Sequence, residues 1–132
     1  IFPYPTTYDI GFFFPGAPGY GVAFGSAMFA SLAIRSFYIP ADAVLSRASL
    51  HYAPTDAVTY PIYKNNSEIG SVFFDADSTN GVFTFPDAVQ FVPGDKLRVL
   101  RPEALDSFQS EGELDLTARD LTITFRALKG TL

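Results

Sequence analysis

Three parts of this sequence carry side chains that could do chemistry. His51 is the sole histidine, and residues 75–81 read DADSTNG. An acidic segment near the C-terminal end adds four carboxylates: Asp106, Glu111, Glu113 and Asp115. A histidine can ligate a metal or act as a general base, an Asp-x-Asp spacing occurs in calcium loops, and paired carboxylates hydrolyse glycosidic bonds. Each of these chemistries needs particular neighbours.

The DADSTNG segment lacks the ligands that an EF-hand loop needs. Thr79 stands where a third ligand is expected, Gly81 comes one position late for the turn, and Pro86 replaces the bidentate Glu. Asn-Gly is a common connection in β-hairpins, because both residues tolerate positive φ. We therefore expect a tight hairpin turn at Asn80–Gly81 instead of a calcium site.

The other two groups also lack partners in the sequence. His51 has no second ligand at a metal-binding spacing, which predicts a surface or hydrogen-bonded strand histidine. Nothing places two of the acidic segment's carboxylates in different environments, so a solvated loop is expected. The Gly- and Pro-rich segment 15–21 lacks the Gly-Lys-Ser/Thr of a phosphate loop and predicts a surface turn. We expect no catalytic, cofactor-binding or metal-binding residues, and no enzyme activity.

The composition indicates one globular domain with an unusually uncharged surface. Hydrophobic residues make up 48% of the 132 residues, with 14 Phe and 7 Tyr, whereas charged residues make up only 17%. This is below the usual fraction of about 25%, and large exposed apolar patches mark interaction sites. The chain is therefore a candidate subunit of an assembly.

Charge and hydropathy exclude several classes of partner. The net charge is −5 and the nine basic residues are scattered, so no nucleic-acid partner is expected. No run reaches about 18 apolar residues, and no membrane insertion is expected. Cysteine is absent, which excludes disulfides and thiolate chemistry. The first residue is Ile1 and no basic signal-peptide region follows it, which fits a processed end or a fragment.

Alternating apolar and polar residues predict a series of antiparallel strands. The clearest stretch is 58–99, where four apolar runs are separated by short turn signals. Strands are expected at 8–14, 28–39, 45–52, 58–63, 68–74, 82–85 and 120–128, with two more around a turn at 93–95. Because Pro61 lacks an N–H donor, we expect its strand at a sheet edge, or Pro61 at a position where the backbone nitrogen points to solvent.

These elements predict an all-β fold, an antiparallel β-sandwich that is jelly-roll-like and has about eight strands. An up-and-down barrel is the alternative arrangement of the same strands. The whole chain, 1–132, is expected to form one domain with an extended N-terminal arm at about 1–7. The aromatic residues Phe2, Tyr4 and Tyr8 are expected to pack on this domain, with a neighbouring subunit as the alternative.

Three segments resemble a group of small β-rich bacteriophage virion proteins found as tail-fibre, tail-associated or head-fibre domains. They are YDIGFFFPGAP at 8–18, PIYKNNSEIGSVFFDADSTNGVFTFPDAVQFVPGDKLRVLRP at 61–102, and DLTITFRALKGTL at 120–132. In that group a KNG-type hairpin, an IG-x-V-x-F strand, a GDxLxV strand and a terminal ITLxG strand recur. This chain differs in Asn66 where Gly is usual, in Pro61, and in its longer acidic loop.

The resemblance implies a structural protein of a phage particle, displayed on the virion surface as a fibre or decoration domain. Its expected partners are copies of itself, most often as a trimer, other capsid or tail proteins, and host-surface glycans during attachment. It assigns no functional residues. The alternative is a carbohydrate-binding module in which Tyr20, Tyr52 or Tyr63 stacks on a sugar. A third hypothesis is a glycosidase that uses the acidic segment.

Overall fold

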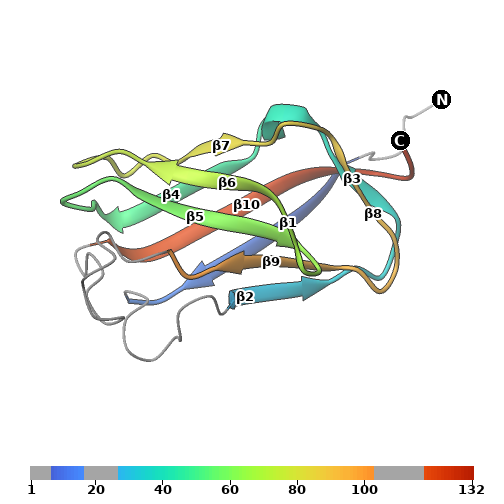
Figure 1. Cartoon of the computed structure of the whole chain (residues 1–132), viewed down its shortest axis with the longest axis horizontal. Coiled ribbons are helices and arrows are strands. Elements are labelled where there is room, and N and C mark those ends of the chain that lie inside the picture. The colour runs from blue at the N-terminus through green and yellow to red at the C-terminus, as the bar shows by residue number, and fades with distance from the viewer. Residues whose placement is uncertain (1–6, 17–26, 103–117) are drawn as a thin grey trace.

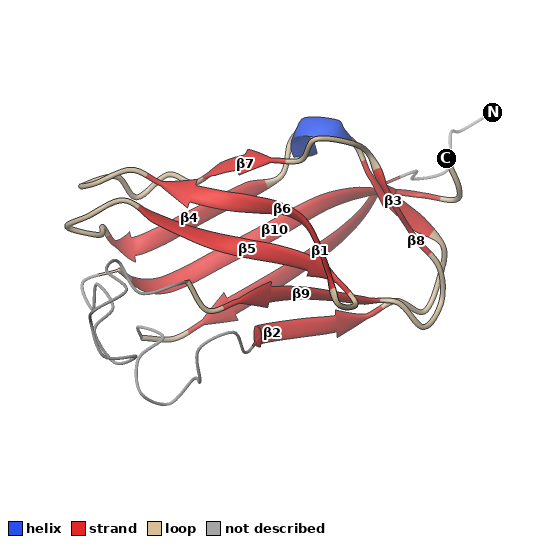
Figure 2. Ribbon diagram, viewed as in Figure 1, coloured by secondary structure: helices blue, strands red, loops and turns tan. Residues whose placement is uncertain are grey.

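The computed structural model describes residues 7–16, 27–102 and 118–132, which form two antiparallel sheets packed face to face (Figure 1, Figure 2). Sheet A contains β1 (Thr7–Phe14), β3 (Phe37–Ile39), β4 (Arg47–Tyr52), β8 (Val89–Phe91) and β10 (Arg119–Lys129). Sheet B contains β2 (Ala27–Leu32), β5 (Val58–Lys64), β6 (Ser67–Phe74), β7 (Val82–Thr84) and β9 (Lys96–Leu100). The one helix of the described residues is a 3₁₀ turn, η1 (Ala41–Ala43). The predicted all-β sandwich is confirmed, and the jelly-roll-like topology stays a prediction.

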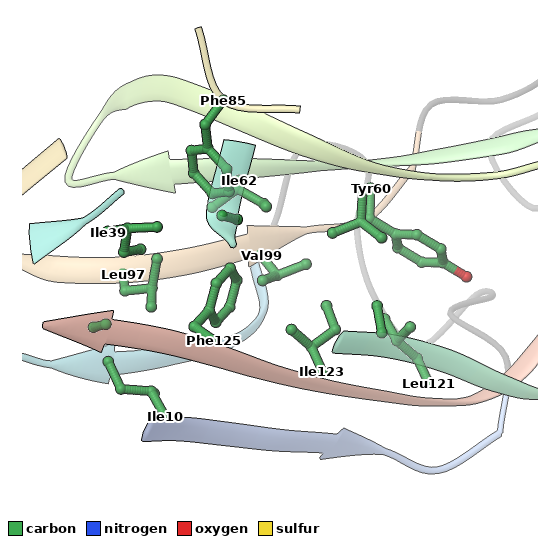
Figure 3. Close-up of a cluster of buried hydrophobic side chains, with 14 of the residues drawn as sticks. Ile10, Ile39, Tyr60, Ile62, Phe85, Leu97, Val99, Leu121, Ile123 and Phe125 are labelled. Atoms are coloured by element: carbon green, nitrogen blue, oxygen red, sulfur yellow. The ribbon is translucent and has the colours of Figure 1, made fainter. Parts of the chain in front are cut away.

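The core lies between the two sheets and follows the predicted alternation. Every second residue of β10 is buried: Leu121, Ile123, Phe125 and Ala127. Figure 3 shows most of these facing side chains of sheet B such as Ile62 and Val99. Burying an aliphatic or aromatic side chain of this kind contributes about 1.5–3 kcal/mol, so this double layer provides the main stabilisation of the fold.

Strand β10 organises sheet A. One of its edges pairs with the whole of β1, from Thr7 opposite Leu128 to Phe14 opposite Leu121. Its other edge pairs first with β4 and then, nearer its end, with β3. Where the chain between β3 and β4 leaves the sheet, the Arg126 N–H donates to Ser46 Oγ at 2.8 Å. The buried Ser46 hydroxyl thus accepts from a β10 amide in the gap between the two strands.

The strand predicted at 28–39 forms two strands, and the described residues contain ten strands in all. The chain leaves sheet B after Leu32 and enters sheet A at Phe37. Ala33 is buried at the crossing, where its N–H donates to Asp95 O at 2.8 Å and its carbonyl accepts from Gly94 N–H at 2.9 Å. These long-range bonds replace the turn residues that normally mark such a break, so the local sequence gives no signal of it.

The prediction that Pro61 marks an edge strand is wrong. Its strand, β5, lies between β6 and β9, and the edges of sheet B are β2 and β7. The β9 pairing begins at Ile62, so Pro61 lies just beyond the part of the strand that is paired on both sides. A missing N–H donor is tolerated there because no β9 residue pairs with that position.

The hairpin turn predicted at Asn80–Gly81 is also misplaced. The turn after β6 lies earlier, where Ser78 N–H donates to Asp75 O at 3.1 Å and Asp77 has φ of 62°. Asn80 instead bridges to Ser49 of β4, and the Gly81 N–H donates to Ala48 O at 2.9 Å. Glycine is needed at 81 for space, because β4 and β6 approach it from both sheets.

Other predictions are confirmed within the described residues. The strands predicted at 58–63 and 68–74 are present and joined by a turn in which Asn65 takes φ of 55°, and Gly94 takes φ of 100° in the turn predicted at 93–95. Tyr8 packs on its own domain, where the centroid of its ring lies 5.1 Å from that of the Phe37 ring. Of the predicted arm at 1–7, only Thr7 is described, and it is the first residue of β1, so Phe2 and Tyr4 lie outside the described residues.

We expect Gly81→Ala to reduce the free energy of unfolding by about 1–3 kcal/mol, the usual cost of overpacking a core. A Cβ at this position would lie 2.8 Å from Val72 Cγ1 and 2.9 Å from both Ala48 Cβ and Phe74 Cζ. Urea denaturation measures the change. Gly11→Ala is the matched control, because its Cβ would meet nothing closer than 3.7 Å. Equal stability of the two variants would contradict the packing role of Gly81.

Candidate functional site

An open depression with a volume of about 460 Å³ lies on the outer face of sheet A. Three strands line it: β1 provides Phe13, β4 provides Ser49, Leu50 and His51, and β10 provides Asp120 and Thr122. Phe13 is 59% exposed although it is a large aromatic side chain. The depression therefore combines one solvent-exposed ring with hydroxyl, imidazole and carboxylate groups.

Strand register brings these residues together. Phe13 pairs with Thr122, and Thr122 pairs with Ser49, so the three form one row across β1, β10 and β4. Side chains paired in this way have Cβ atoms about 4.5–5.5 Å apart. The central member of the row is the small Thr122, which leaves a low floor between the Phe13 ring and the β4 side chains.

Asp120 is held in place by a reciprocal pair of hydrogen bonds. Gly16 N–H donates to Asp120 Oδ1 at 2.7 Å, and Asp120 N–H donates to Gly16 O at 3.1 Å. Asp120 has φ of 62°, a conformation that Asp adopts more readily than most residues. Among the described residues, none donates a hydrogen bond to its Oδ2 atom, and Asp120 lines the depression.

Aromatic and cationic groups continue from the depression along β4. The His51 ring meets the Tyr52 ring edge-on, with centroids 4.6 Å apart. The Arg119 guanidinium carbon lies 4.8 Å from the centroid of the Tyr52 ring, which is a cation–π distance. Tyr52 is 48% exposed, but Arg119 stacks on it and thus competes with any ligand for one ring face.

The outer face of sheet B carries a second surface, which we call the Phe73 face. It consists of two cross-strand rows: Thr59, Phe73 and Val82, and next to them Pro61, Ser71 and Thr84. None of the six side chains is charged. Phe73 is 38% exposed and its partner Val82 is 60% exposed. A contiguous uncharged patch of this kind is typical of an interaction surface.

A third region, at the turn between β5 and β6, is built around hydrogen bonds of Asn65. The Asn65 side chain accepts from Lys96 N–H at 2.9 Å and donates to Asp95 Oδ1 at 3.1 Å. The Arg98 guanidinium donates to Asn65 O at 2.9 Å. A depression of about 430 Å³ lies here, lined by Asn65, Asn66, Lys96 and Arg98. Its polar groups join two turns of sheet B.

The pKa of the Asp95 carboxyl lies below its ordinary value of 3.8, mainly because the Val92 N–H donates to it. The Asn65 amide and the Lys64 ammonium, 3.7 Å away, lower the pKa further. Because the pKa is lower in the folded protein, the charged carboxylate stabilises the fold above pH 3.8. This contribution is lost as the pH falls through the folded-state pKa.

The candidates from the sequence lie in different places. His51 is exposed, as predicted, and lines the depression, whereas Tyr63 is half-buried on sheet B opposite Arg98. Tyr20 and the acidic segment with Asp106, Glu111, Glu113 and Asp115 lie outside the described residues. Phe13 was not among the candidates from the sequence. It shares a strand face with Gly11 next to the turn, and this position could have identified it as an exposed aromatic residue.

Metal and membrane signatures are not found in the described ranges. Across 7–16, 27–102 and 118–132, no three His, Asp or Glu side chains gather closely enough to hold a metal ion. Asp75 Oδ1 accepts the N–H of the next residue, Ala76, at 2.9 Å, as in a turn. In the same part of the chain no helix has the length and hydropathy to cross a membrane.

Comparison with known proteins gives no relative on which a function could be based. No protein-family model matches the chain, and no curated protein matches its sequence.

We expect Asp95→Asn to lower the free energy of unfolding by about 1–2 kcal/mol at pH 7, because an amide cannot accept from both Val92 N–H and Asn65 Nδ2. The loss should shrink as the pH falls from 3.8 through the lower folded-state pKa, where the wild-type carboxylate becomes protonated. Denaturation at a series of pH values measures it. The exposed Asp87→Asn is the control and should change stability by less than about 0.5 kcal/mol. A pH-independent loss would contradict the charge-based role.

Proposed function

We propose that this protein is a structural subunit of a bacteriophage particle, a surface-displayed fibre or decoration domain that acts through contacts made by a rigid β-sandwich. The resemblance of segments 8–18, 61–102 and 120–132 to small virion proteins supports the assignment to a particle. The uncharged Phe73 face is the observation that supports assembly.

The chemistry of the Phe73 face suits contact with another protein. Phe73 and Val82 are adjacent in register, so a partner could cover both at once. Interface centres are depleted in charge and enriched in aromatic residues, whereas interface rims are polar. The hydroxyl side chains of Thr59, Ser71 and Thr84 lie beside the apolar pair and would form part of such a rim.

The expected partner is a second copy of the chain, within a homo-oligomer that is most often a trimer in the resembled group. Closed symmetric assemblies are the commonest form of soluble oligomer. Other capsid or tail proteins are the alternative partners of the same face. The proposed location is the surface of the virion, where such a subunit would stabilise the particle.

Binding of host-surface glycans is the second proposed role. It corresponds to the carbohydrate-binding alternative, and the observation that favours it is the open depression with the exposed Phe13 ring on the opposite sheet. Assembly through sheet B would leave this depression accessible, so the two roles are compatible.

We expect the double variant Phe73→Ser/Val82→Ser to convert the oligomer to monomers. Removal of a central aromatic and its neighbour costs about 3 kcal/mol of association, or about a hundredfold in the dissociation constant. Light scattering over a range of concentrations measures the mass, and sedimentation with purified particles measures association with the virion. Both side chains are exposed, so the variant should fold.

The matched control is Phe13→Ser, which removes an exposed ring from the other sheet and should leave the oligomer unchanged. A wild-type protein that stays monomeric and does not bind particles would overturn the proposal. An oligomer that survives the double substitution would show that another face holds it together.

A further inference from the structure

We infer that the depression formed by β1, β4 and β10 is a binding site for one pyranose ring of a neutral saccharide. The inference rests on the second proposed role, glycan binding, and names the residues and the class of sugar. It is independent of assembly through the Phe73 face, which lies on the other sheet.

The exposed Phe13 ring supplies the apolar part of the site. A pyranose presents C–H groups on its faces and hydroxyl groups around its edge, so it needs a flat apolar surface with polar groups beside it. Phe13 is 59% exposed and stands at one side of the low floor formed by Thr122. The neighbouring Phe12 points inward, where its ring stacks on that of Phe29 with centroids 4.4 Å apart. The alternation along β1 therefore leaves Phe13 on the outer face.

Polar groups surround this floor on the other sides. Ser49 and Thr122 provide hydroxyls that both donate and accept, and His51 provides an imidazole. Asp120 provides a carboxylate whose Oδ1 atom is fixed by Gly16 N–H. Its Oδ2 atom can accept from a sugar hydroxyl, and a hydrogen bond to a charged acceptor is stronger than one to a neutral acceptor.

The charge of the lining selects a neutral sugar. The six lining residues include the Asp120 carboxylate but no Lys or Arg. Arg119 stacks on Tyr52 and Arg126 pairs with Asp9, whereas Arg47 lies on the same face of β4 as Ser49 but outside the lining. A carboxylate on the sugar would therefore face Asp120 without a compensating cation among the lining residues, and acidic sugars should be disfavoured.

The width of the depression matches one pyranose ring. β1 and β4 flank β10, so their backbones lie about 10 Å apart, twice the spacing of paired strands. The site is open, with a volume of about 460 Å³. A monosaccharide has few atoms with which to gain binding energy, so we expect a dissociation constant of about 1 mM for a single unit. Several copies of the chain in one oligomer would raise the avidity for a glycan surface.

Titration of the ¹⁵N-labelled protein with methyl glycosides of glucose, galactose, mannose and N-acetylglucosamine tests the site. At least one sugar should shift the amide signals of Phe13, Ser49 and Thr122, whereas N-acetylneuraminic acid should not. Phe13→Leu, which keeps apolar bulk but loses the flat ring, should weaken binding about tenfold, and Phe13→Trp should retain it.

Asp120→Asn isolates the role of the charge. Asn also tolerates positive φ and can still accept from Gly16 N–H, so the local fold should persist while neutral sugars bind about tenfold more weakly. Phe73→Ser is the control and should leave monosaccharide affinity unchanged.

The outcomes separate this inference from the proposed functions. If none of the four neutral glycosides shifts these signals at about 50 mM, far above the expected dissociation constant, the inference is overturned. Binding of N-acetylneuraminic acid to the wild-type protein, with shifts of the same amide signals, would overturn the assignment to neutral sugars. If a sugar binds and the Phe13 and Asp120 variants bind it as tightly as the wild type, the sugar occupies another place on the protein. This outcome would reject the site but not glycan binding. The oligomeric state of the wild-type protein bears only on assembly.

Discussion

The pairing of β10 with three other strands is the constraint on which the rest of the structure depends. Within the described residues, β1 joins sheet A only through β10, and β4 pairs with β10 along most of its length. Leu121, Ile123 and Phe125 are fully buried, so this strand also anchors the core. Its outer face carries Thr122, which is why Phe13 and Ser49 lie on opposite sides of one depression.

The fold tolerates local strain where this pairing requires it. Ala43 and Leu45 both have positive φ, a conformation that costs an ordinary residue about 1–2 kcal/mol. Both residues lie in the segment that connects β3 to β4. Between the two strands, Ser46 Oγ accepts from Arg126 N–H. The strained turn therefore keeps β3 and β4 on the same edge of β10.

Alternation along single strands was enough to predict the sandwich and most of its core. Val58, Tyr60 and Ile62 alternate along β5 and are buried on one face, and the alternate residues of β10 are buried in the same way. The errors concern positions where distant segments decide the outcome. Ala33 crosses between sheets through bonds to Gly94 and Asp95, and Asn80 pairs with Ser49 instead of turning. No local pattern contains this information.

The candidate site was harder to predict for the same reason. Phe13 and Thr122 are adjacent in space but more than a hundred positions apart in the sequence, and only the register between β1 and β10 joins them. The sequence showed which face Phe13 occupies, but not its neighbours. His51 was correctly placed on the surface, yet three of the other residues that line the depression come from β1 and β10.

Thr7 begins β1 and pairs with Leu128 near the end of β10, so these two strand ends lie at the same end of the sandwich. The described chain enters β1 and leaves β10 side by side at one end of the sandwich (Figure 1). Phe13 lies six residues further along β1, or about 20 Å away at the usual rise of a strand. A neighbouring domain, an affinity tag or a solid support joined next to either strand end would therefore hold the molecule at one end and present the depression at the other.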